Sequence, residues 1–232
     1  MGEKVQKVQI LNNTHVRVDL DSGKDIVGDA LFYAVGRQAE SESLNLEAAS
    51  VETAKRGLIP VNEFFQTTQS HIYAAGDVIG FPALASTAME QGRLCSQHMF
   101  GTARPMKPVF PYGIYTIPEI SVVGHSEQEL TKLKIPYKTG IAKYEETAKG
   151  QMMGGPHIDG FLKLMFCPTS HRLLGASAIG ESATEIIHVG QVVMSMNGTI
   201  EYFRDSVFNF PSYHELWRVA ALDGLNKDGL KA

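Results

Sequence analysis

The residues with the clearest potential for chemistry lie in the stretch IYAAGDVIGFPALASTAMEQGR, at positions 72–93. An apolar run ends there at Gly76 and Asp77, and small residues follow where a helix is expected to begin. In open α/β sheets, ligands bind at the carboxyl ends of strands, and the first turn of the next helix presents free amide groups. Asp77 could accept hydrogen bonds from ligand hydroxyls. The layout suits a nucleotide or a flavin, but an aspartate at this point can equally be a turn former or a neighbour of the helix cap.

The elements that lead to this stretch begin with three strand-like segments. Residues 5–10, 14–20 and 25–35 alternate between apolar and polar residues, and Asn12-Asn13 and Asp21-Ser22-Gly23 provide turns between them. The last segment ends in ALFYAV, which is apolar on both faces. This pattern predicts a strand buried within a larger sheet.

The next passage should carry the candidate site. Residues 37–68 read mainly as loop and short helix, and residues 59–78 predict a short strand, a polar turn and a buried strand that ends at Gly76. From Ala85 to Phe100, apolar and small residues recur at helical spacing, and Gly101 is a plausible cap at the end of that helix. The helix would therefore begin directly after the candidate site.

A second unit should follow the proline-rich segment 103–111, which is typical of a domain crossover. We predict strands at 113–124, 137–153 and 160–180, the last as two strands joined by a turn at 168–171. Ser126 and Glu129 form a capping-box pattern that predicts a helix start. Amphipathic helices are expected at 182–198 and 212–225. An antiparallel sheet with helices on one face is an α+β arrangement.

Composition excludes several classes of protein. The formal net charge is −4 with both signs interspersed, so the chain has no basic face for nucleic acid. Its apolar runs are too short to cross a membrane, and Glu3, Lys4 and Lys7 stand where a secretory signal would be apolar. We therefore expect no nucleic-acid or membrane partner and a cytoplasmic location. Cys95 and Cys167 show neither disulfide nor zinc spacing, so we interpret both as core thiols and predict no metal site.

The segments TTQSHIYAAGDV and ALASTAMEQGR resemble the second FAD-contacting segment of the flavoprotein disulfide reductase family, whose members include glutathione reductase and lipoamide dehydrogenase. The resemblance implies that Asp77, beside Gly76, bonds the ribityl chain. It also implies that the backbone amides at Ala83, Leu84 and Ala85 approach the pyrimidine edge of the flavin ring.

Two further segments extend this resemblance. LFYAVGRQAES resembles the end of the family's NAD(P) domain, with Gly36 at the crossover, and GIYTIPEISVVG resembles the start of its interface domain, where the position of Ile114 lies near the nicotinamide. The chain would then divide into the C-terminal strands of an NAD(P)-binding domain (1–37), the C-terminal part of an FAD-binding domain (38–108) and an α+β dimerisation domain (109–232). The first two would be incomplete α/β pieces, and the third would form a homodimer.

The same resemblance implies that part of the cofactor machinery lies elsewhere. The family's GxGxxG fingerprints and its redox-active cysteine pair would precede the segments matched here, and no GxGxxG occurs in these 232 residues. We therefore expect this chain alone to hold FAD weakly or not at all, with NAD and NADP as substrates of the whole protein.

The segment FNFPSYHELWR bears on the type of reaction. Disulfide-reducing members carry a His-Pro pair here, whereas this chain has Phe210 before Pro211 and keeps Glu215 as a candidate. A phenyl ring cannot transfer protons, so we nominate no catalytic side chain. The segments YGIYTIPEIS, EIIHVGQ, NGTIEYF and WRVAALDGLN are similar to the transhydrogenase branch of the family. That likeness implies hydride exchange between NADPH and NAD+ through flavin, without a thiol relay.

Three interpretations stay open on the sequence. The chain could belong to such a transhydrogenase, to a lipoamide-dehydrogenase-like disulfide oxidoreductase with an altered C-terminus, or to a dimerisation module that binds no cofactor. Phe210 could cover the flavin of a partner subunit or be a core aromatic beside Trp217. Because residues 109–232 hold a complete antiparallel pattern, we expect protease resistance to be concentrated after Pro111.

Overall fold

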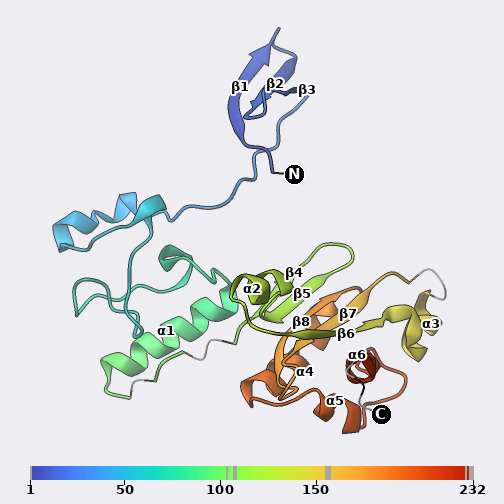
Figure 1. Ribbon diagram of the computed structural model, residues 1–232. Coiled ribbons are helices and arrows are strands. Elements are labelled where there is room, and N and C mark those ends of the chain that lie inside the picture. Colours follow the sequence, from blue (N-terminus) through green and yellow to red (C-terminus); the bar gives the residue numbers. More distant parts are fainter. Residues whose placement is uncertain (1, 103, 107–108, 155–157, 228, 230–232) are drawn as a thin grey trace.

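The computed structural model describes residues 2–102, 104–106, 109–154, 158–227 and 229 (Figure 1). A small sheet at the N-terminus connects through an extended segment to a region that contains the helix α1, and a larger α/β unit follows (Figure 1). Of the proline-rich crossover at 103–111, positions 103, 107 and 108 lie outside the described residues. No described helix has the length and apolar character needed to cross a bilayer.

The first sheet is antiparallel in the order β1-β2-β3. Its strands are β1 (Val5–Leu11), β2 (His15–Leu20) and β3 (Asp25–Gly28). Asn12 and Asn13 both have positive φ angles, 50° and 57°, as a tight hairpin turn requires. Val8, Val18 and Ile26 stand opposite one another on one face, and Ile26 is 59% exposed. This face therefore has an apolar row without a covering layer among the described residues.

The apolar segment ALFYAV is not a buried strand. Residues 29–35 have no regular structure, and Phe32 is 91% exposed. A strand that is apolar on both faces needs neighbours on each side and layers above and below. The described residues supply neither, so the prediction was wrong for this chain although the segment's composition is that of a buried strand.

The middle region is mostly irregular up to α1 (Ala85–Met99), which confirms the predicted helix. The predicted strands within 59–78 are wrong, because only one isolated bridge forms there, between Gln66 and Tyr73. The region contains four short 3-10 helices: η1 (Glu42–Leu44), η2 (Leu46–Ala49), η3 (Lys55–Gly57) and η4 (Gly76–Ile79). Val51, Ile59 and Ala74 form a small core that holds these segments together.

The C-terminal unit is built on a five-stranded antiparallel sheet in the order β4-β5-β8-β7-β6. Its strands are β4 (Pro111–Ile114), β5 (Ile120–Gly124), β6 (Lys138–Lys143), β7 (Phe161–Phe166) and β8 (Leu173–Ile179). Its helices are α2 (Glu127–Lys132), η5 (Tyr144–Glu146), α3 (Ala148–Gly154), α4 (Ala183–Ser195), α5 (Glu201–Asp205) and α6 (Glu215–Lys227). This confirms the α+β fold class.

The main core of the unit lies between the sheet and the helices α4, α5 and α6. Trp217 is fully buried there, packs against the tilted ring of Phe203 with 4.7 Å between ring centres, and donates a hydrogen bond to the carbonyl of Ile186. We predicted that all the helices lie on one face of the sheet, and this prediction was wrong. Leu130 of α2 packs against Met165 on the opposite face, in a smaller cluster.

Two other predictions need correction. Residues 137–153 form a strand only as far as Lys143 and then turn into η5 and α3, because Glu146 accepts the amide hydrogen of Lys143 and so starts a helical turn. Cys95 is a buried core thiol as predicted, whereas Cys167 is only partly buried. It lies at the end of β7, next to the turn into β8, where the chain leaves the core.

The outer strand β6 is protected on its open edge. The carboxylate of Asp223 in α6 accepts the amide hydrogen of Ile141 over 2.8 Å, and Lys227 pairs with the same carboxylate. The opposite edge strand, β4, is four residues long and begins with Pro111. The β6 edge is therefore covered by a side chain of α6, whereas the β4 edge is short and begins with a proline.

Limited proteolysis should cut this chain first between residues 29 and 37. This segment is exposed and irregular, whereas the sheet after Pro111 has a buried apolar cluster on each of its faces. We expect a stable fragment that starts near Pro111 and persists after the N-terminal sheet is released, as measured by mass spectrometry over a time course. Equal survival of both halves would contradict this expectation.

Candidate functional site

The segment from Gly76 to Ala85 places polar groups at the start of α1. Gly76 has a φ of +82° and its amide donates to the buried side-chain oxygen of Gln91 over 2.6 Å. A Cβ atom at this position would lie 3.3 Å from the Cβ of Ala88. Glycine therefore allows both the left-handed backbone and the close contact with α1.

Asp77 follows in η4 with its side chain 47% exposed. Its carboxylate lies 3.5 Å from the guanidinium of Arg37, which is itself largely exposed. No other ion pair or side-chain hydrogen bond of Asp77 occurs within the described ranges. A surface pair of this kind contributes at most about 1 kcal/mol, so a ligand with better partners could displace it.

The N-terminus of α1 presents unpaired backbone donors. Ala83 has a φ of +50°, and the amides of Ala83, Leu84 and Ala85 donate to no acceptor among the residues that the structure describes. Leu84 is the N-cap residue and lacks a capping side chain, and Ala83 and Ala85 are exposed. The helix dipole adds partial positive charge at this end. The three amides are therefore free to bind an oxygen atom from outside.

The structure brings only some of the predicted site residues together. Gly36, with a φ of +117°, directly precedes the Arg37 that reaches Asp77, so the crossover segment lies beside the start of α1. Ile114 is 42% exposed on the edge strand β4. Neither Ile114 nor residues 210–215 have a recorded interaction with Asp77 or with Ala83–Ala85. Gly36, Gly76, Asp77 and Ala83–Ala85 thus belong to one local site, whereas Ile114 and the segment 210–215 lie apart from it.

Phe210 lies in the exposed segment between α5 and α6, where it is 75% exposed. Its interpretation as a core aromatic beside Trp217 is therefore wrong, because Phe203 takes that place. Glu215 is the first residue of α6, and one of its carboxylate oxygens is buried without a partner among the described residues. His214 stacks on Phe208 instead of reaching Glu215.

Two residues that shape this site, Gln91 and Arg37, were not among the predicted site residues. Gln91 fixes the backbone at Gly76 from the second turn of α1, and Arg37 neutralises Asp77 from the crossover segment. A glutamine on the apolar face of a predicted helix indicates a buried side chain that needs a hydrogen-bond partner, so Gln91 could have been predicted to hold a nearby backbone group. Arg37 and Asp77 are 40 positions apart in the sequence, so no local pattern predicts their ion pair.

The turn after β4 is attached to the start of α4. The carboxylate of Glu119 accepts hydrogen bonds from the hydroxyl of Thr184 over 2.6 Å and from its amide over 3.1 Å. The N-cap residue of α4, Ser182, supplies no side-chain cap of its own. Glu119 therefore caps α4 from a neighbouring hairpin, the one that carries Ile114.

These two hydrogen bonds predict a pH dependence of stability. They lower the pKa of Glu119 below its ordinary value, first through the hydroxyl and then through the amide of Thr184. A lowered pKa in the folded state means that the stabilisation is present above the unfolded pKa, about 4.3, and is lost as the pH falls through the folded value.

We expect Glu119→Gln to reduce the loss of stability between about pH 5 and pH 3, measured by urea unfolding at each pH. Glu52→Gln is a suitable control, because the Glu52 carboxylate has no recorded partner among the described residues. If both variants follow the wild-type pH profile, Glu119 does not cap α4 in solution.

Comparison with known proteins assigns the family. Residues 1–92 match the family model of pyridine nucleotide-disulphide oxidoreductases, and residues 110–221 match the model of their dimerisation domain. The chain therefore belongs to the pyridine nucleotide-disulphide oxidoreductase family. The two matches leave residues 93–109 between them, an interval that includes the end of α1 and most of the proline-rich segment.

Among individual proteins, the chain is 47% identical to the soluble pyridine nucleotide transhydrogenase of Mycobacterium tuberculosis, over 97% of this chain and 48% of that protein. The enzyme of the same name from Serratia proteamaculans is also 47% identical, over 97% of this chain and 49% of that protein. The chain spans about half the length of these curated relatives.

Solved structures confirm the fold. The flavoprotein disulfide reductase RclA from Escherichia coli superposes with a TM-score of 0.83 at 24% identity, over 94% of this chain and 49% of that chain. LpdA from Mycobacterium tuberculosis superposes with a TM-score of 0.80 at 23% identity, over 94% of this chain and 48% of that chain. At these identities the likeness concerns the fold alone.

Proposed function

We propose that this chain supplies the flavin-contacting loop and the subunit interface of an FAD-dependent NAD(P)+ transhydrogenase, which moves hydride between NADPH and NAD+ without a thiol relay. The single observation that carries the proposal is the open set of amides at Ala83–Ala85 beside the exposed carboxylate of Asp77. The names of the relatives with 47% identity support this choice of reaction.

The residues present fit one end of the cofactor. Unpaired amides at a helix N-terminus suit the carbonyl oxygen on the pyrimidine edge of a flavin, and a carboxylate suits the hydroxyls of a ribityl chain. Small side chains at Ala83 and Ala85 allow a flat group to approach. No GxGxxG fingerprint occurs for the diphosphate. We therefore keep the expectation that this chain alone binds FAD weakly or not at all.

When bound, the flavin would supply the hydride chemistry, and the protein would orient it. Asp77 and the amides at Ala83–Ala85 would hold the ring and its ribityl chain. The position of Ile114, on the hairpin that Glu119 attaches to α4, would border the nicotinamide, as the family resemblance implies.

The side chain of Phe210 supports a reaction without a thiol relay, because it cannot act as an acid or a base. An exposed phenyl ring replaces the family's acid/base, and one carboxylate oxygen of Glu215 is buried without a hydrogen-bond partner among the described residues. In a homodimer built through residues 109–232, Phe210 would cover the flavin environment of the partner subunit. Cys95 and Cys167 are both free thiols, and neither belongs to a pair with the spacing of a redox-active motif.

Removing the Asp77 carboxylate should weaken flavin binding. We expect Asp77→Ala to raise the dissociation constant for FAD about tenfold, since hydrogen bonds to a charged group contribute about 1.5–3 kcal/mol. The measurement is quenching of flavin fluorescence during titration with this chain. Where this chain binds too weakly, the same variant is made in a protein of the relatives' full length that contains it.

Asp29→Ala is the matched control, because the Asp29 side chain is 96% exposed and its partner is His15 of the N-terminal sheet. In the longer protein, transfer of hydride from NADPH to thio-NAD+ should proceed, whereas lipoamide and other disulfides should not be reduced. Disulfide reduction would favour the lipoamide-dehydrogenase-like alternative. Tight dimers without any flavin binding would favour the cofactor-free module.

A further inference from the structure

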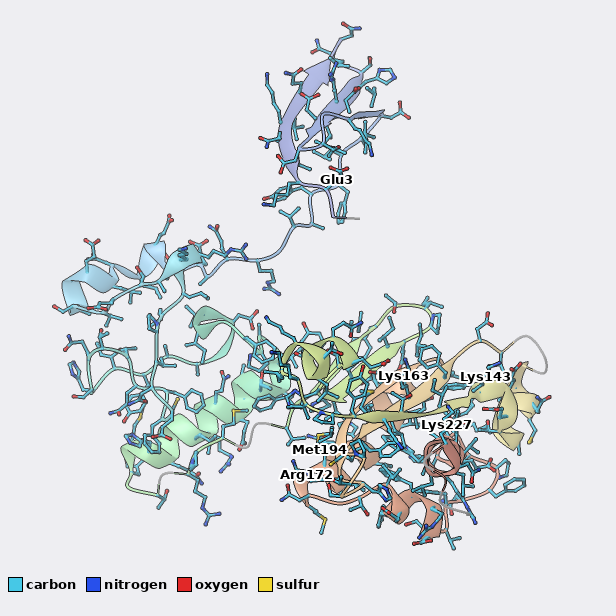
Figure 2. All side chains as sticks on the ribbon, in the orientation of Figure 1. Glu3, Lys143, Lys163, Arg172, Met194 and Lys227 are labelled. Carbon is cyan, nitrogen blue, oxygen red and sulfur yellow. The ribbon has the colours of Figure 1, made fainter. Side chains whose placement is uncertain are left out.

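A cavity of about 850 Å³ lies between the loop that precedes α1 and one end of the five-stranded sheet. Phe81 and Pro82 form one wall, and β4, β5 and β8 form another with Tyr112, Val122 and Ser177. The side chains of Arg172 and Met194, which also line it, lie close together on the side of the unit nearest α1 (Figure 2). A cavity of this size can hold a small organic molecule.

The walls of the cavity are mainly apolar and partly aromatic. Phe81, Phe110 and Tyr112 contribute rings, and Met194 adds a flexible thioether that adapts to the shape of its neighbours. The backbone behind these side chains is held by the pairing of β5 with β8, in which Val122 stands opposite Ser177. A flat apolar group would therefore meet complementary surface on more than one side.

The charged groups at the cavity are not balanced. The guanidinium of Arg172 has no ion pair or hydrogen bond with any described residue, and His125 also lines the cavity. The carboxylate of Glu129 is already engaged, since it accepts hydrogen bonds from the amide and the hydroxyl of Ser126 in the capping box of α2. The cavity thus offers an unpaired cation beside apolar walls, which favours an anionic ligand.

We propose that this cavity is a binding site for a small aromatic carboxylate, whose ring lies between Phe81 and Tyr112 and whose carboxylate pairs with Arg172. The site is distinct from the Asp77 site, although the two share one loop. Phe81 and Pro82 line the cavity, and Ala83 directly follows them with its amide open on the flavin-contacting side. A ligand in the cavity would therefore restrain the loop that carries the proposed flavin contacts.

The test is isothermal titration of this chain with 2-naphthoate and with its neutral counterpart 2-naphthamide. We expect one molecule of naphthoate per chain and binding at least tenfold weaker for the amide. Arg172→Gln should weaken naphthoate binding about tenfold and leave naphthamide binding unchanged. Arg104→Gln is the matched control, because Arg104 is also an exposed arginine without a described partner, and it does not line the cavity.

A second variant tests the cavity without altering its charge. Ser177→Phe should fill the space beside Val122 and remove binding of both compounds, while far-ultraviolet circular dichroism confirms that the sheet is intact. The proposal is overturned if naphthoate does not bind, if naphthamide binds equally well, or if Arg172→Gln behaves like Arg104→Gln. Binding that survives Ser177→Phe would also overturn it, because the ligand would then lie elsewhere.

Discussion

Replacing Trp217 with alanine is expected to remove about 3–5 kcal/mol from the free energy of unfolding. The indole is fully buried between α4 and α6, it packs against the tilted ring of Phe203, and its N–H bonds the carbonyl of Ile186. A Cβ built on Gly190 would lie 2.3 Å from the indole ring, so α4 is shaped to this side chain. The alanine variant loses the packing and also the hydrogen bond that the indole N–H donates to Ile186.

Urea unfolding followed by far-ultraviolet circular dichroism measures this effect without relying on tryptophan emission. Tyr115→Ala is the control, since Tyr115 is a large aromatic residue of the same unit and is 80% exposed. Its free energy of unfolding should change by no more than about 0.5 kcal/mol. A comparable loss in both variants would show that the effect is not specific to the buried indole.

The second large effect is expected for Gly140→Ala, with a loss of about 3 kcal/mol. Gly140 lies in β6, where α6 crosses so closely that a Cβ atom would be 2.0 Å from the carbonyl oxygen of Ala220 and 2.9 Å from the amide of Gly224. Both atoms belong to backbone, so they cannot move aside as a side chain would. The helix would have to separate from the strand.

Gly92→Ala provides a control with the opposite sign. A Cβ at Gly92, within α1, meets no atom within 4 Å. Alanine should therefore stabilise that helix by about 1 kcal/mol through its higher helix propensity. The same urea titration measures both variants. If Gly140→Ala is as stable as wild type, the close crossing of α6 over β6 is not present in solution.

Local sequence signals predicted the C-terminal unit well. The capping box at Ser126 forms as predicted, with the side chain of Glu129 bonding the amide of Ser126. The turn at 168–171 and the helix α4 lie where periodicity placed them. The capping box and the turn depend on residues that are close in the sequence, and α4 packs on a core formed within the same unit. Local patterns were therefore sufficient to predict these elements.

The first hundred residues were harder to predict, because their patterns describe structure that this chain does not complete. ALFYAV has the composition of a central strand, yet it has no neighbouring strand among the described residues and lies exposed. The strand expected before Gly76 reduces to a single bridge. A strand needs a partner for its backbone groups, and composition alone cannot provide one.

The candidate site was predictable in its residue types but not in its contacts. Glycine followed by aspartate and then by small residues indicated a ligand loop, and the open amides at Ala83–Ala85 agree with that interpretation. The ion pair between Arg37 and Asp77 and the anchoring role of Gln91 depend on tertiary structure. Arg172 likewise has no charged partner among the described residues, and this depends on which groups the fold places near it.

The side chain of Asp223 has a consequence for how the chain must fold. It accepts the amide hydrogen of Ile141 in the outer strand β6, and it belongs to α6, near the end of the chain. Until α6 has docked, that strand exposes its amides as a template for another strand, which is the usual route to intermolecular aggregation. Variants or truncations that delay docking of α6 should therefore lower the yield of soluble protein before they alter the native structure.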